Sequence, residues 1–209
     1  MHNLNRVFMM SAFALIVLMG YVSFATATGS EFRSSIEQDF QKARRDYLQK
    51  DMKSAAAEIQ KGVSYLKSEA ETATGKGKEA LTKSYRELEK LAADVERGTV
   101  TSEKKVETEF ARAYHALATN SYIKSTESWS RKEIKNTGKY LDEAMKYLKQ
   151  GYYWAGQKAE SGTEEVIKKS KDLSQKLEQG TGWVADQVRK GLTDTENEIE
   201  KFGQKVSSK

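Results

Sequence analysis

Residues able to do chemistry are few in this sequence, as its histidines and cysteines show. The chain has 209 residues, two histidines and no cysteine. His115 lies between Tyr114 and Leu117 in a helical run, "AYHALA". A metal site built on it would need carboxylates as its other ligands, and a cysteine site is impossible. We therefore expect His115 to pack between helices, and we expect no metal and no cofactor.

The remaining motifs that suggest chemistry have simpler interpretations. The run "GKGKEALTKS" at 75–84 resembles a phosphate-binding loop, but it lacks the P-loop spacing and a preceding strand. Glu103 and Glu107 have helical spacing among opposite charges, which is typical of surface ion pairs. No nucleophile elbow or zinc-protease motif occurs. We expect that the protein is not an enzyme and that it has no catalytic residue.

Aromatic side chains are therefore the main candidates for a contact site. Tyr140, Tyr147 and Trp154 are spaced by seven residues, so they share one face of a helix. Such a face could contact a partner protein, an apolar ligand or the C-terminal part of the chain itself, and we favour the last. A second pair, Tyr47 and Trp129, precedes two helix breaks and is expected to pack across the mouths of two hairpins.

The composition indicates that helices carry all of these residues. The chain has no proline, although proline normally makes up about 5% of residues. Proline breaks helix interiors, so its absence favours long continuous helices and an all-α fold. The 35 basic and 30 acidic residues are interspersed, whereas nucleic-acid-binding proteins cluster their positive charge. We expect no nucleic acid partner; weak contact with an anionic membrane surface stays open.

The first 27 residues have a different character from the rest. An uncharged run at 7–24 follows Arg6, and "ATA" at 25–27 has the small-x-small pattern of a signal-peptidase site. We expect a signal peptide at 1–27, cleaved near Ala27, and a periplasmic or extracellular protein. The apolar run is also long enough to serve as an uncleaved anchor.

Apolar residues at a helical period divide the chain into helices with short breaks. The breaks are predicted at 49–51, 72–78, Gly98 to Ser102 and 130–133, with Asp51 as an N-cap. Two predicted helices, 52–70 and 134–152, align at an offset of 82 residues, and the offset also places Tyr47 on Trp129. We predict an antiparallel helical bundle of two duplicated helical hairpins at 28–158.

The segment 159–209 is predicted as a C-terminal amphipathic helical extension. Its apolar stripe is thin and is interrupted by glycines at 180, 182, 191 and 203. Such a stripe favours packing along a helix of the same chain or of a partner. A membrane surface and a loose tail are the alternatives.

Two resemblances accompany this pattern. The helix pairs look like tetratricopeptide hairpins, but they lack the proline of that family and its period of about 34 residues. The runs "ARAYHALATNSYIKSTESW" at 111–129 and "TGKYLDEAMKYLKQG" at 137–151 are similar to YfdX-like proteins. That resemblance covers about 35–158, and it implies a helical, periplasmic protein associated with stress responses.

These observations predict a non-enzymatic secreted protein that acts in the cell envelope by protein binding or structural support. Its partner would be a second copy or another envelope protein. The alternative is an amphipathic-helix carrier of lipid or of an apolar small ligand, whose helices open to cover the cargo.

Overall fold

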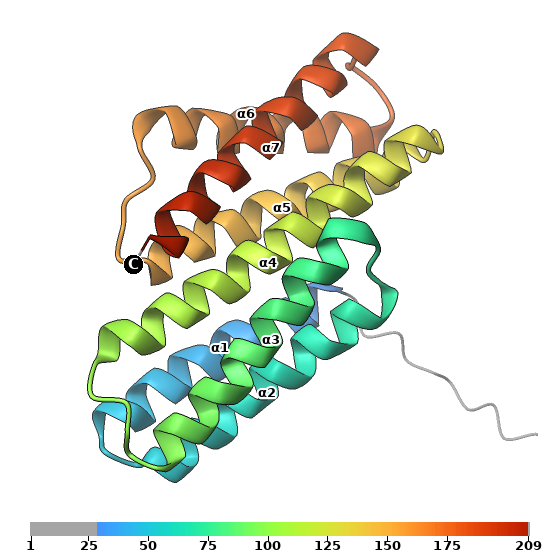
Figure 1. The fold of residues 1–209 in the computed structure, drawn as a ribbon. Coiled ribbons are helices and arrows are strands. Elements are labelled where there is room, and N and C mark those ends of the chain that lie inside the picture. Colours follow the sequence, from blue (N-terminus) through green and yellow to red (C-terminus); the bar gives the residue numbers. More distant parts are fainter. Residues whose placement is uncertain (1–28, 209) are drawn as a thin grey trace, which may run out of the picture.

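The computed structural model describes residues 29–208, which form seven α-helices and no strand (Figure 1). This confirms the predicted all-α bundle. The helices are α1 (Gly29–Leu48), α2 (Met52–Thr72), α3 (Gly75–Glu96), α4 (Glu103–Ser130), α5 (Ile134–Trp154), α6 (Ser161–Gln179) and α7 (Ala185–Ser207). The predicted signal peptide lies outside the described residues. Among the described helices, none is long and apolar enough to cross a membrane.

The two predicted hairpins, α1–α2 and α4–α5, have turns of the same backbone form. Lys50 and Lys132 both adopt a left-handed conformation, with φ of 66° and 60°. The Lys50 N–H donates to the Tyr47 carbonyl at 3.1 Å, and the Lys132 N–H donates to the Trp129 carbonyl at 3.0 Å. Asp51 caps α2 as predicted, because its carboxylate accepts the Ser54 N–H at 3.1 Å. The matching turns agree with an offset of 82 residues; the duplication itself stays a prediction.

Helix α4 lies in the middle of the molecule, between α1–α3 on one side and α5–α7 on the other (Figure 1). The ring of Phe110 in α4 stacks on Phe40 of α1, with centroids 4.1 Å apart. The predicted apolar rows of α2 and α5 face this core. Their buried members are Ala56, Ile59, Val63, Leu66 and Ala70 in α2, and Gly138, Leu141, Met145, Leu148 and Tyr152 in α5.

The α2–α3 connection is shorter than the predicted loop at 72–78. Helix α3 begins at Gly75, so the connection comprises Ala73 and Thr74. Gly77 lies inside the helix because α3 approaches α4 closely there. A Cβ atom at Gly77 would be 2.9 Å from the Asn120 side-chain oxygen. The glycine allows close packing of the two helices. In the sequence, the same glycine had indicated a loop.

The described part of the C-terminal segment, 159–208, packs on the chain's own bundle. Helix α6 packs on α5, and α7 packs on α4 and α6. A buried apolar cluster joins these helices. Its members are Leu141, Leu173, Leu177, Val188 and Leu192. Of the expected alternatives, the structure shows packing within the chain, and the expected boundary at 158 falls between two helices that contact each other.

Candidate functional site

The predicted aromatic face does not form a surface. Trp154 is 2% exposed, and Tyr147 is 6% exposed. The Trp154 ring packs edge-on against Phe110 at 5.0 Å, and its Nε1 donates to Glu37 at 3.2 Å. Tyr140 is half-buried, beside the ammonium group of Lys139. The expected burial under the C-terminal segment is therefore wrong for Trp154, because α1 and α4 cover it.

Tyr147 has a polar partner inside the bundle. Its hydroxyl lies 2.7 Å from the hydroxyl of Tyr65 in α2. Burial raises the pKa of Tyr147, and Tyr65 raises it further. This tyrosine pair joins the two hairpins at positions 82 residues apart. The two hydroxyl groups form a hydrogen bond with each other, which holds α2 against α5. We therefore assign the pair a structural role.

The hairpin-mouth residues Tyr47 and Trp129 lie in different surroundings. Tyr47 is buried, and its hydroxyl donates to the Val100 carbonyl at 2.9 Å. Trp129 is half-buried, and its ring lies edge-on to Trp183 at 5.8 Å. Tyr47 of α1 therefore contacts the connection between α3 and α4, and Trp129 of α4 contacts the connection between α6 and α7. Packing across the mouths of the two hairpins stays a prediction for both.

Glu103 and Glu107 form the surface ion pairs that their spacing predicted. Arg44 of α1 contacts both carboxylates, at 2.7 and 3.2 Å. Each carboxylate is partly exposed to solvent. These ion pairs connect the first turn of α4 to α1.

A groove lined by three helices lies between α3 and α7. Residues of α4 form its floor, and we name it the α3–α7 groove. Its volume is about 750 Å³, which is within the range of ligand-binding clefts. Its lining residues are Lys76, Glu79, Ala80 and Lys83 of α3, His115, Thr119, Tyr122 and Ile123 of α4, and Glu196, Ile199, Glu200, Gly203, Gln204 and Ser207 of α7.

His115 lies on the floor of this groove. A Cβ atom at Gly203 would be 2.5 Å from the His115 Nε2, so glycine is required for α7 to approach α4 here. Burial lowers the pKa of His115, a hydrogen bond to the Ile199 backbone opposes the shift, and Lys83 adds to it. The neutral imidazole is therefore the form that packs under α7, in agreement with the predicted helix-packing role.

The two walls of the groove differ in charge. The α3 side carries Lys76, Glu79 and Lys83, and the α7 side carries Glu196 and Glu200. Burial raises the pKa of Tyr122, and a hydrogen bond with Glu196 raises it further. A floor of aromatic, aliphatic and hydroxyl side chains between charged walls suits an amphipathic ligand more than a uniformly charged one. No local pattern in the sequence indicates this groove, because α3 and α7 are far apart in the chain.

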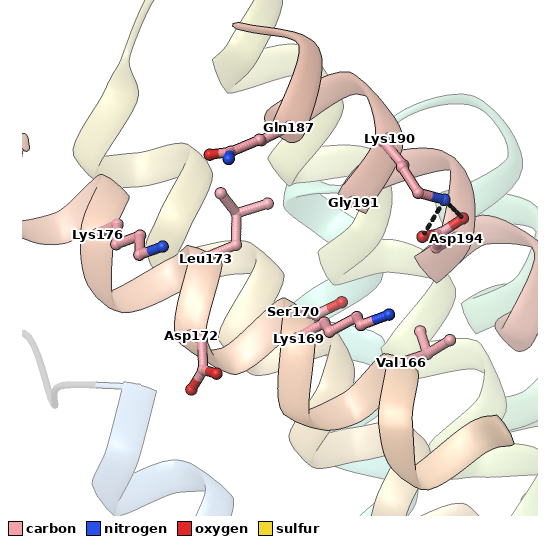
Figure 2. A pocket seen from close by; sticks show the side chains of 10 residues that line it. All are labelled: Val166, Lys169, Ser170, Asp172, Leu173, Lys176, Gln187, Lys190, Gly191 and Asp194. Atoms are coloured by element: carbon pink, nitrogen blue, oxygen red, sulfur yellow. Dashed lines mark hydrogen bonds and ion pairs between the residues drawn. The ribbon is translucent and has the colours of Figure 1, made fainter. Parts of the chain in front are cut away.

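A smaller hollow of about 290 Å³ lies between α6 and α7 (Figure 2). Leu173 of α6 points toward Gly191 of α7, where a Cβ atom would lie 2.5 Å from the leucine. Lys190 is paired with Asp194 at its edge, at 3.0 Å. Another lining lysine, Lys169, is paired with Glu165 of its own helix. The hollow is therefore open space around Leu173 with charged groups at its edge.

The described residues contain no cluster of histidine and carboxylate groups suited to a metal ion. Comparison with known proteins places no further residue in a functional role. No protein-family model, no curated protein and no solved structure matched the chain.

Proposed function

We propose that this is a non-enzymatic binding protein of the cell envelope, which holds a protein partner in the α3–α7 groove. The observation that carries the proposal is the groove itself, with tyrosine and isoleucine side chains on its floor and charged residues on both walls. The envelope location rests on the predicted signal peptide. A role under stress rests on the similarity to YfdX-like proteins.

The distribution of apolar surface supports a rigid binding protein over a carrier that opens its helices. Among the described residues, the exposed large hydrophobic side chains are Leu48, Tyr153 and Val184. They belong to three separate segments and form no continuous apolar face. A lipid-covering helix would need such a face, and here the apolar faces pack on one another.

A second candidate function is binding of an apolar small molecule in the same groove. The observation that favours it is the volume of about 750 Å³, which would suit a ligand of moderate size. Liposome flotation at low salt separates the lipid form of this candidate from protein binding. Co-flotation of the mature protein with anionic vesicles would favour the carrier.

Site-specific photo-crosslinking in cells that make the protein tests the proposal. A photoreactive amino acid replaces Gln204 on the groove wall or Gln175 on the exposed face of α6, where both side chains are exposed. We expect discrete protein adducts from position 204 and none from position 175. Equal adducts from both positions, or none from either, would contradict protein binding in the groove.

A further inference from the structure

The structural correspondence at an offset of 82 residues extends beyond the hairpins to α3 and α6. Gly98 and Gly180 follow these helices with φ of 68° and 75°. The next N–H groups, of Thr99 and Thr181, donate to carbonyls five residues earlier at 3.0 and 3.1 Å. Leu91 and Leu173 are both buried in these helices, as are Val95 and Leu177. The correspondence therefore spans three helices. We call α1–α3 the first unit and α4–α6 the second unit.

Helix α7 corresponds to α4 in the same way. The two helices begin at residues 103 and 185, and the buried Val106 and Val188 occupy the equivalent position in each. Helix α4 packs antiparallel on α1, through Tyr114 on Glu37 and Glu103 on Arg44. Helix α7 packs antiparallel on α4, through Glu196 on Tyr122 and Val206 on Arg112. Helix α7 thus has the place of the first helix of a third unit.

In the second unit, α5 fills the space beside the pair of first helices, α1 and α4. There the C-terminal turn of α5 lies against α1. Trp154 donates to Glu37 and packs edge-on to Phe40, with ring centroids 6.4 Å apart. The Gln41 side chain donates to the Tyr153 hydroxyl at 3.3 Å. Glu37, Phe40 and Gln41 of α1 therefore contact the aromatic C-terminal turn of α5.

The residues of α4 equivalent to Glu37, Phe40 and Gln41 are Thr119, Tyr122 and Ile123. All three line the α3–α7 groove. On the other wall, Glu196 and Glu200 of α7 are equivalent to Tyr114 and Ala118 of α4, which are buried. Helix α7 is the last helix of the described residues, which run to residue 208. The groove is thus the place where the second helix of that unit would dock.

We infer that the α3–α7 groove receives the C-terminal turn of a helix from another protein, with an aromatic side chain on that turn. This rests on the proposed function and names the chemistry of the partner. The aromatic ring lies on Tyr122 and Ile123, and its N–H or O–H donates to Glu196. A second copy of this chain is a poor donor. Its Trp154 and Tyr152 are each 2% exposed, and the hydroxyl of its exposed Tyr153 already accepts a hydrogen bond from Gln41.

The chain supplies its own probe for this inference, a fluorescent peptide of residues 139–157 with the sequence KYLDEAMKYLKQGYYWAGQ. Fluorescence anisotropy measures its binding to the full mature chain. We expect saturable binding, and we expect Trp154→Ala in the peptide to weaken it about tenfold or more, because the ring is the anchor. In the protein, Gln204→Trp fills the groove from the α7 wall and is expected to weaken binding by a similar factor.

Gln175→Trp is the matched control, since it places the same side chain on the exposed face of α6. Circular dichroism and thermal unfolding check that both variants fold. Absence of saturable binding, or equal loss with both tryptophan variants, overturns the inference. Adducts from position 204 without peptide binding would leave protein binding in the groove intact and reject the aromatic helix end as its occupant.

Discussion

At the scale of single residues, His115 links the groove to pH. Burial lowers its pKa in the folded chain from the ordinary value of 6.5. The unfolded chain therefore takes up a proton first as pH falls. Stability that is present above about pH 6.5 is lost progressively down to the lower pKa of the folded form. Lys83 on α3 adds to the lowering, and Glu196 and Glu200 face the same groove from α7.

We expect His115→Gln to reduce the loss of stability between pH 7.5 and 5.5. Glutamine keeps a hydrogen-bond donor for the Ile199 backbone and cannot gain a charge in this range. The measurement is the free energy of unfolding in urea at each pH, for the natural chain and the variant. An equal decrease for both proteins would show that other groups dominate the acid sensitivity of this fold.

The two left-handed lysines test the match between the hairpin turns. A non-glycine residue in this conformation carries a penalty of roughly 1 kcal/mol, which glycine does not. We expect Lys50→Gly and Lys132→Gly each to stabilise the protein by about 0.5–1 kcal/mol. Lys53→Gly, in the exposed first turn of α2, is expected to destabilise it by a similar amount. Chemical denaturation measures all three, and opposite signs at positions 50 and 132 would contradict equivalent turns.

At the scale of elements, Gly138 sets the distance between α5 and α6. A Cβ atom there would lie 2.7 Å from the Ser174 carbonyl oxygen and 3.1 Å from the Glu178 nitrogen, and both are backbone atoms. We expect Gly138→Ala to cost about 1–3 kcal/mol, because the backbone of α6 must shift. The control is Gly162→Ala, which meets no atom within 4 Å and should be neutral or slightly stabilising. Thermal unfolding compares them; equal effects would argue against close packing at Gly138.

Elements were more predictable from the sequence than the site. The break at 49–51 was correct, and the break at 130–133 was predicted one residue early. Both could be located because an acidic residue ends each break and the apolar periodicity changes phase there. The spacing of Tyr147 and Trp154 put them on one face correctly, yet periodicity does not say which helix covers a face. The loop at 72–78 was too long because Gly77 serves packing.

The groove was the least predictable feature, since it depends on how α3 and α7 meet over α4. One signal was present in the sequence: the offset that aligned the hairpins also aligns Leu91 with Leu173 and Gly98-Thr99 with Gly180-Thr181. Extending the comparison past α5 would have shown a longer unit. It would still have left open whether α7 packs on α4, which depends on Gly203 as much as on apolar residues.

At the scale of the whole molecule, the C-terminal half of α7 belongs to the same core as the first hairpin. Phe202 of α7 is fully buried, and its ring lies 4.5 Å from that of Tyr152. The Tyr152 hydroxyl donates to Glu198 of α7 at 3.2 Å, which ties α5 to the same helix. One continuous apolar cluster contains Phe202 together with residues of α1 and α2. These contacts favour unfolding as a single cooperative unit.

This cooperativity makes the effect of one substitution in α7 measurable in α2. Phe202→Ala removes a buried ring and should cost about 3–5 kcal/mol. If the molecule unfolds as one unit, the slowest-exchanging amides around Ile59 and Leu66 lose protection by the same free energy. Native-state hydrogen exchange with mass spectrometry reads both helices in one experiment. Loss of protection confined to α7 would mean that this helix opens alone, and that the α3–α7 groove can widen without unfolding the remaining bundle.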